Sequence, residues 1–310
     1  MRPASLAVAA LLLVGTTASA LPSQWEQRAQ LPGARTEVAA ATLGGGVAVV
    51  GGFTADGAHS ARVDVYSPAR DRWQRLPDLP VTVHHAMAVG DAARLYVLGG
   101  YDEDGRPRRT TFVFGDGRWR ALPRLPFPRA AGGAALVRGR VVVVGGVVRA
   151  NGERLARRAL SYDLRAGKWA VIPGPTAREH LGVAALGGTV FAVAGRLSGL
   201  NTNLATFEAW RPGAKKWRRL PPVPGARGGT GATGAAGQIV SAGGEERGGA
   251  IAEVYAYRLA SHKWQRLPNL PTPRHGLGLA AIGGSVFAIG GGPEPGLTVS
   301  AVNETLAIRG

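Results

Sequence analysis

Residues 243–275 read GGEERGGAIAEVYAYRLASHKWQRLPNLPTPRH, and the same order of features recurs along the 310-residue chain. A glycine pair ends an apolar run, an aromatic strand follows, then a tryptophan, and a Leu-Pro hinge leads to the next strand. A fixed interval near fifty residues, with strands that end in glycine pairs, is typical of β-propeller blades. The repeat tryptophans are Trp25, Trp73, Trp119, Trp169, Trp217 and Trp264, and the pairs are Gly51-Gly52, Gly99-Gly100, Gly145-Gly146, Ala194-Gly195, Gly243-Gly244 and Gly290-Gly291.

Each repeat predicts four antiparallel strands. The first is rich in Ala and Gly, which suits an innermost strand where several blades crowd around an axis. A turn such as Gly187-Gly188 leads to a second, fully apolar strand, as expected for a strand covered on both faces. The repeat tryptophan lies on the fourth strand, and we expect it to be buried between blades. Prolines such as Pro77 and Pro80 cannot donate to a sheet, so the hinge must leave the blade.

The two ends of the chain predict how the ring closes. The last repeat supplies three strands, the final one near residues 302–308, and no tryptophan follows them. The missing fourth strand lies near Trp25, which would cover an otherwise open sheet edge. The sequence therefore predicts an all-β, six-bladed β-propeller of four-stranded antiparallel blades, closed by an N-terminal strand that completes the last blade.

Glycine pair, aromatic strand, spaced tryptophan, Leu-Pro hinge and Arg/His strand start together resemble the Kelch repeat family. The resemblance covers essentially all of residues 21–310, and Ala194 is a local departure from the glycine pair. It implies a propeller scaffold, and the leader described next suggests the exported bacterial type. Because propellers host many unrelated functions, the resemblance does not define an activity.

The first twenty residues have the pattern of a secretory signal peptide. A positive start at Met1-Arg2 is followed by a nine-residue apolar stretch, residues 6–14, and by the small residues Ala18-Ser19-Ala20. We expect residues 21–310 to form a single propeller domain, exported to the periplasm or the extracellular space. The apolar stretch is too short to span a membrane, so no transmembrane segment is expected after cleavage. The chain has no cysteine, which excludes disulfides and a lipid-modified start.

The chain is strongly basic, with 37 Lys and Arg against 20 Asp and Glu. An exported protein of this charge is expected to be drawn to anionic surfaces, including acidic glycans of the cell envelope. A generally basic solvated surface explains the same composition. Nucleic acid is not expected as a partner, because the aromatic residues are accounted for by the blades and export separates the protein from it.

One rim of the propeller is the best candidate surface. In a four-stranded meander, the start of the first strand and the loop after the glycine pair lie at the same rim. Five arginines recur 16 positions before the pair, and they suit either an interblade role or the recognition of carboxylate, sulfate or phosphate. They are Arg35, Arg129, Arg178, Arg227 and Arg274.

The two positions after each of these strand starts, which is Val83 in the second blade, differ between blades and add further ligand-binding candidates. Histidine is the usual proton carrier near neutral pH, and glutamate can act beside it. The candidates are Glu37, His84, His85, Glu179, His180 and His275. No tight metal-ligand spacing is present, so we predict no metal site and no cofactor.

Three functions are considered for these features, and two remain open. We favour an exported, non-enzymatic binding protein whose Arg/His-rich rim holds a protein segment or an acidic glycan of the cell envelope, because no catalytic motif is recognisable. The alternative is a sugar mutarotase similar to bacterial N-acetylneuraminate epimerases, which would require Glu37 or Glu179 to meet Arg178 in one pocket. A copper-radical oxidase similar to galactose oxidase is set aside, because its cofactor requires a cysteine.

Overall fold

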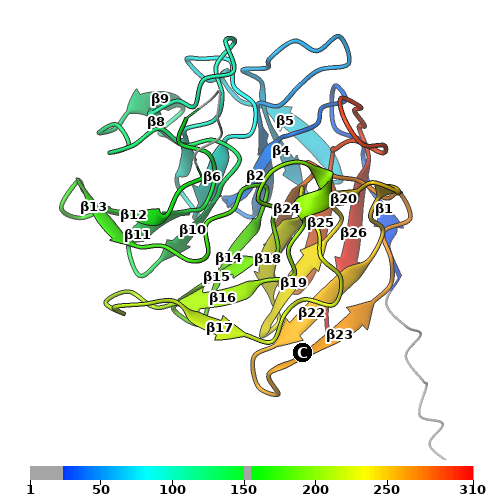
Figure 1. The fold of residues 1–310 in the computed structure, drawn as a ribbon. Coiled ribbons are helices and arrows are strands. Elements are labelled where there is room, and N and C mark those ends of the chain that lie inside the picture. Colours follow the sequence, from blue (N-terminus) through cyan, green and yellow to red (C-terminus); the bar gives the residue numbers. More distant parts are fainter. Residues whose placement is uncertain (1–23, 150–154, 310) are drawn as a thin grey trace, which may run out of the picture.

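The computed structural model describes residues 24–149 and 155–309. The expected signal peptide therefore lies outside the described residues. Six four-stranded antiparallel sheets are arranged around a central axis (Figure 1), as predicted. No helix in the described ranges combines the length and apolar character needed to cross a membrane.

The first three blades follow one another along the chain. Blade one contains β2 (Ala39–Leu43), β3 (Gly46–Val50), β4 (Val63–Ser67) and β5 (Arg72–Arg75). Blade two contains β6 (Met87–Gly90), β7 (Leu95–Leu98), β8 (Thr111–Gly115) and β9 (Arg118–Ala121). Blade three contains β10 (Gly133–Val137), β11 (Arg140–Val144), β12 (Arg158–Asp163) and β13 (Lys168–Pro173).

The other three blades carry the additional short elements. Blade four contains β14 (Gly182–Leu186), β15 (Thr189–Val193), β16 (Phe207–Trp210) and β17 (Arg218–Leu220), with a 3₁₀ turn η1 (Leu200–Thr202) in its loop. Blade five contains β18 (Gly231–Ala235), β19 (Gln238–Ala242), β22 (Val254–Arg258) and β23 (Lys263–Leu267), with a small hairpin of β20 (Glu245–Glu246) and β21 (Gly249–Ala250). Blade six contains β24 (Gly278–Ile282), β25 (Ser285–Ile289), β26 (Asn303–Ala307) and β1 (Glu26–Gln27).

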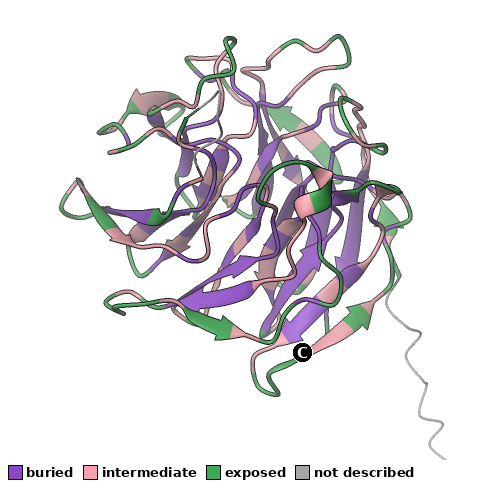
Figure 2. Cartoon of the chain, in the orientation of Figure 1, coloured by how far each residue is buried: buried purple, intermediate pink, exposed green. Residues whose placement is uncertain are grey.

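The first strand of each blade lies at the centre, where neighbouring blades meet. Small residues are required there: a Cβ added at Gly133 would lie 2.3 Å from a side-chain carbon of Val183 in the next blade. The second strands are buried along their whole length in most blades, as in β3 and β15, because blades cover both of their faces. Figure 2 shows this buried interior and the exposed loops around it.

The repeat tryptophans are half-buried, which corrects the expectation that they are buried between blades. They lie on the outermost strands or, for Trp25 and Trp217, directly before them. Each still joins two blades, because its indole N–H donates to a backbone carbonyl four positions after the tryptophan of the preceding blade. For Trp169 the acceptor is Pro123, at 2.8 Å, and for Trp25 it is Pro268, at 2.9 Å.

Blade six closes the ring as predicted. Strand β1 pairs antiparallel with β26, so that Glu26 faces Thr305 and Gln27 faces Glu304. The order β1-β26-β25-β24 therefore combines the two ends of the chain in one sheet. This closure holds all six first strands at fixed positions around the axis.

Candidate functional site

The predicted rim is built by one contact repeated in every blade. The residue after each strand-start position pairs through an isolated antiparallel bridge with the residue that follows the glycine pair. Segments about 17 residues apart in sequence therefore share one rim, as the meander predicted. The six bridges are Thr36 with Phe53, His84 with Tyr101, Ala130 with Val147, Glu179 with Arg196, Gly228 with Glu245, and His275 with Gly292.

The next residue in each blade belongs to a ring of backbone hydrogen bonds around the axis. All six residues have φ between 50° and 68°, a left-handed conformation that favours glycine. Five of them donate their N–H to the carbonyl of the equivalent residue in the preceding blade, and Val38 N–H closes the ring on Gly276 O. The six residues are Glu37, His85, Ala131, His180, Gly229 and Gly276.

The five recurring arginines do not line the rim surface. Each is at most 2% exposed and lies inside its blade. Arg178 donates to Ala194 O, the first residue of its blade's pair, at 2.6 Å, and to Glu208 at 2.6 Å. Burial lowers the pKa of Arg129 to about 10, which leaves its guanidinium charged at neutral pH. The buried pairs of the other blades are Arg35 with Asp64 and Arg274 with Glu304, while Arg227 and Arg129 donate to the carbonyls of Glu253 and Arg158.

This burial corrects the hypothesis that the arginines form a ring of ligand-binding forks. The arrangement fits the structural role considered from the sequence, with one difference: each guanidinium bonds to carbonyls or an acid of its own blade and not to a neighbouring blade. The 16-residue spacing has a physical cause in blades one, four and five, where the arginine reaches the carbonyl of the first pair residue.

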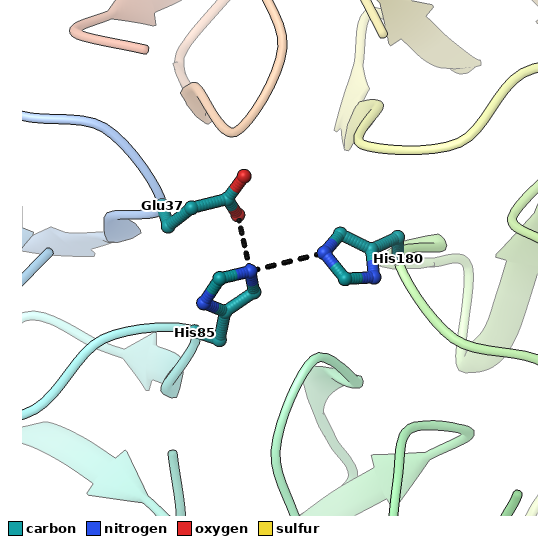
Figure 3. Close-up of side chains that lie close together, drawn as sticks. All are labelled: Glu37, His85 and His180. Carbon is teal, nitrogen blue, oxygen red and sulfur yellow. Dashed lines mark hydrogen bonds and ion pairs between the residues drawn. The ribbon is translucent and has the colours of Figure 1, made fainter. Parts of the chain in front are cut away.

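Three side chains of the ring converge on the axis (Figure 3). His85 Nε2 lies 3.0 Å from Glu37 Oε2 and 3.0 Å from His180 Nε2. These atoms come from blades one, two and four, and all three lie within 4.8 Å of one another. The remaining ring positions carry Ala or Gly, which leave space at the centre.

Polar side chains surround these three residues. Glu179 Oε2 lies 2.9 Å from His180 Nδ1, and His84 Nδ1 lies 2.6 Å from His85 Nδ1. His275 Nδ1 lies 3.3 Å from the second carboxylate oxygen of Glu37. Every histidine and glutamate predicted for the rim is therefore in this cluster.

Two charged residues of the cluster were missed from the sequence. Arg196 donates to Glu179 at 2.9 Å and to Glu245 at 2.6 Å, so it links blades four and five. Both missed residues directly follow glycine pairs. In the predicted meander, the residue after each glycine pair lies at the same rim as the start of the first strand. Applied to single residues, this pattern would have identified Arg196 and Glu245.

The cluster changes the proton affinities of its members. Burial raises the pKa of Glu37, but the surrounding histidines outweigh this effect and hold the pKa well below its usual value. Burial, assisted by His180 and opposed by Glu37, lowers the pKa of His85 to about 4. For His275, burial lowers the pKa, but Glu37 and Glu245 reverse the shift and raise it. At neutral pH, His85 is therefore a neutral imidazole beside a carboxylate.

Two cavities meet at these three side chains. The outer cavity, which we call the mouth, has a volume of about 360 Å³. The inner cavity, of about 130 Å³, lies among the Ala/Gly-rich first strands and forms the start of the central channel. Glu37, His85 and His180 line both cavities, so they separate the mouth from the channel. The mouth is bordered by these three and by Arg196, Leu200 and Leu297, among others.

The acidic residues of the loop after Gly99-Gly100 lie in an exposed turn of their own. Asp102 accepts hydrogen bonds from the backbone N–H groups of Asp104 and Arg106, and Arg106 pairs with Asp104 on the exposed surface. This is a solvated turn. The arginine-rich segment 149–158 falls partly outside the described residues.

Comparison with known proteins gives the family of this scaffold. The family model described as the KLHDC2/KLHL20/DRC7 Kelch-repeats domain matches residues 83–292, and the Kelch motif matches residues 34–80. The protein is a six-bladed β-propeller with a cluster of histidine and charged side chains at one end of its channel. The chain belongs to the Kelch repeat family.

Several curated proteins are similar to the chain. Kelch-like protein terF from Aspergillus terreus is 27% identical over 274 residues, which cover 78% of this chain and 59% of that protein. Beta-scruin from Limulus polyphemus is 26% identical over 60% of this chain, and Kelch-like protein 41b from Danio rerio is 28% identical over 42%. The chain covers 22% of the length of each of these two relatives. As a Kelch repeat protein, it is suited to protein interaction.

Proposed function

We propose that the protein is an exported, non-enzymatic binding protein that holds a segment of another protein at the mouth. The observation that carries this proposal is that leucine side chains border the outer opening of a cavity whose inner end is lined by histidines and glutamates. Leu297 borders the mouth and is 54% exposed, and Leu200 borders it and is half-buried. Leucines beside a cavity favour contact with apolar side chains, while the histidines and glutamates below suit a few oriented polar contacts.

A protein segment fits this surface better than an acidic glycan. Recognition of an acidic glycan would use free guanidinium groups, whereas the five recurring arginines are buried. Arg196, which does border the mouth, is already engaged by Glu179 and Glu245. The mouth therefore offers aliphatic contacts more readily than unpaired cations.

The mutarotase alternative receives no support from the site. It required Arg178 to meet Glu37 or Glu179 in one pocket. Arg178 instead donates to Glu208 and to the carbonyls of Ala192 and Ala194 inside blade four. Its guanidinium does not line the mouth.

A displayed library of random peptides, selected against residues 21–310, tests the binding proposal without a known partner. We expect selected peptides to bind at least about tenfold more weakly to Leu297→Asp, because burial of a leucine side chain contributes about 1.5–3 kcal/mol. Val171→Asp is the matched control: Val171 is 42% exposed, lies on outer strand β13, and should leave binding unchanged. Failure to enrich any sequence, or equal binding by Leu297→Asp, would reject the mouth as the binding surface.

The export part of the proposal rests on the leader-like residues 1–20. Mass spectrometry of the protein recovered from the producing cell's extracytoplasmic fractions should find a chain that begins at Leu21. Recovery from the cytosol alone, with the leader attached, would contradict it.

A further inference from the structure

We propose that Glu37, His85 and His180 form a binding site for one divalent transition-metal ion, of the class to which Zn²⁺ belongs, at the inner end of the mouth. Two imidazole nitrogens and one carboxylate oxygen are a donor set that such ions bind in proteins. This proposal does not depend on the peptide-binding proposal, because metal uptake can be measured without a peptide.

The distances between the donor atoms suit this class of ion. With metal–ligand bonds of about 2.0–2.1 Å in tetrahedral geometry, two ligand atoms lie roughly 3.3 Å apart. His85 Nε2 is 3.0 Å from both Glu37 Oε2 and His180 Nε2, and no pair among the three exceeds 4.8 Å. Small side-chain rotations would place the three atoms around one centre.

Proton counting gives an independent reason. A neutral imidazole carries one N–H, so His85 Nε2 cannot donate to both Glu37 and His180 in two full hydrogen bonds. If His85 Nε2 instead accepts from His180, its lone pair lies 3.0 Å from a carboxylate oxygen of Glu37. In the first arrangement one N–H is shared between two acceptors, and in the second two electron-rich atoms lie against each other. A bound cation resolves this, because both Nε2 atoms and the carboxylate then direct lone pairs at the same positive charge.

The residues behind the donors complete the arrangement. When Nε2 binds a metal, the proton of each imidazole lies on Nδ1. His180 Nδ1 lies 2.9 Å from a carboxylate oxygen of Glu179, and His85 Nδ1 lies 2.6 Å from His84 Nδ1, so an acceptor stands near each of these protons. Carboxylates and other acceptors in this position fix the tautomer and orientation of ligating histidines. His275 lies beside the remaining oxygen of Glu37.

The backbone at the donor positions supports a functional origin. All three residues have left-handed φ, at 52°, 52° and 50°, where Gly229 and Gly276 occupy the equivalent positions of two other blades. The scaffold therefore accepts glycine there, and larger residues are disfavoured on backbone grounds alone. Strain of this kind concentrates at functional sites. The donors are 9–13% exposed and border the mouth, so an ion can reach them and keep coordination positions for water or a bound partner.

Metal titration of the full exported chain, freed of any histidine tag and treated with a chelator, tests the proposal. We expect Zn²⁺ uptake measured by calorimetry and elemental analysis to saturate at one ion per chain and to raise the melting temperature, because only the folded state holds the site. Excess Mg²⁺ or Ca²⁺ should not compete, since both prefer all-oxygen sites. Co²⁺ in the same site should show the visible absorption of a nitrogen- and oxygen-bound ion.

The variants separate metal binding from folding. His180→Gly and His85→Gly introduce glycine, the residue that adopts the left-handed backbone of these positions most readily. The metal-free variants should therefore melt no lower than metal-free wild type, but they should lose stoichiometric uptake of Zn²⁺. Glu179→Gln should keep one ion per chain with an affinity 10–100-fold lower, as typical of a residue that orients a ligand. His262→Ala removes an exposed histidine from a turn at the opposite rim and is the control that should bind as wild type does.

Two results would overturn the site. One is that the wild-type chain takes up no Zn²⁺. The other is uptake by His180→Gly and His85→Gly that matches wild type in stoichiometry and affinity, which would place the ion elsewhere.

Discussion

Arg178 illustrates how a charged residue becomes part of the interior of this protein. Its side chain has no exposed area, and it donates to three carbonyls as well as to Glu208. Glu208 also accepts hydrogen bonds from the backbone and the hydroxyl of Thr176. The pair is therefore a desolvated ion pair whose partners depend on one another.

At the scale of this residue, we predict that Arg178→Met destabilises the fold strongly. Removal of the cation leaves the Glu208 carboxylate buried without its counter-charge, which costs about 3–5 kcal/mol in free energy of unfolding. Urea unfolding followed by tryptophan fluorescence measures the change. Arg75→Met is the control, because Arg75 and Asp78 form an exposed pair whose loss should cost less than about 1 kcal/mol. Losses of similar size in the two variants would show that burial of the pair does not govern stability.

At the scale of the strand, the outermost element of each blade has a joining role. Its tryptophan is half-buried, but its indole N–H reaches the hinge of the preceding blade. Trp73 follows the same rule with Ala29, which stands where the other hinges have proline, at 2.8 Å. The periodic tryptophan thus links each blade to its neighbour by one directed bond as well as by packing.

We predict that Trp169→Phe lowers the free energy of unfolding by about 1 kcal/mol. Phenylalanine keeps a ring on β13 but cannot donate to Pro123, and a net hydrogen bond contributes about 0.5–1.5 kcal/mol. Chemical denaturation monitored by circular dichroism measures the loss. Val171→Ala, an exposed position on the same strand, should change stability by less than about 0.5 kcal/mol. If Trp169→Phe were equally neutral, the bond would be replaced by water at no cost.

At the scale of the whole molecule, closure depends on the short N-terminal strand. Beyond its pairing with β26, the segment is fastened to blade one, because Asp71 Oδ1 accepts from the backbone N–H of Ala29 at 2.9 Å and from the Tyr66 hydroxyl at 2.6 Å. Asn303 also donates to Ala29 O. The N-terminal segment thus joins the last blade to the first.

This fastening predicts a pH-dependent stability. The hydrogen bonds from Ala29 and then Tyr66 lower the pKa of Asp71, so its contribution is fully present above the ordinary aspartate pKa of about 3.9 and is lost as pH falls through the lower folded-state value. Wild type should therefore melt above Asp71→Asn at pH 7, and the difference should shrink below pH about 4. Calorimetric melts across this range measure it. A difference that stays constant down to acid pH would show that the carboxylate charge is not responsible.

The sequence predicted the scaffold well because its signals are local and repeated. A glycine pair, a hinge proline and a tryptophan each determine one part of a blade, and the missing tryptophan after residue 308 indicated how the ring closes. The rim positions of Glu37, His85 and His180 followed from the same meander. Their convergence was not predictable, because it depends on three blades up to 143 residues apart in sequence meeting at one axis.

The arginines show where residue-level inference failed. Their recurrence was visible, but their burial is determined by partners on the third strand, such as Asp64 for Arg35 and Glu304 for Arg274, about 30 residues away. Recurrence alone does not distinguish a buried contact within each blade from an exposed binding group. The residue type at the ring positions differs between blades, and this variation was the better indicator of the site. The variable side chains are the ones that face the cavity.

The ring of hydrogen bonds around the channel makes this protein comparable to a macrocyclic receptor with exchangeable substituents. Because its bonds join backbone atoms only, the substituent at one position can change while the macrocycle keeps its shape. Three positions carry donor groups in this chain, and Ala131, Gly229 and Gly276 carry none. Aspartate and asparagine tolerate left-handed backbone best among non-glycine residues, so they are the natural choice for installing a fourth donor at Gly229. The chemistry of the mouth can thus be altered one substituent at a time.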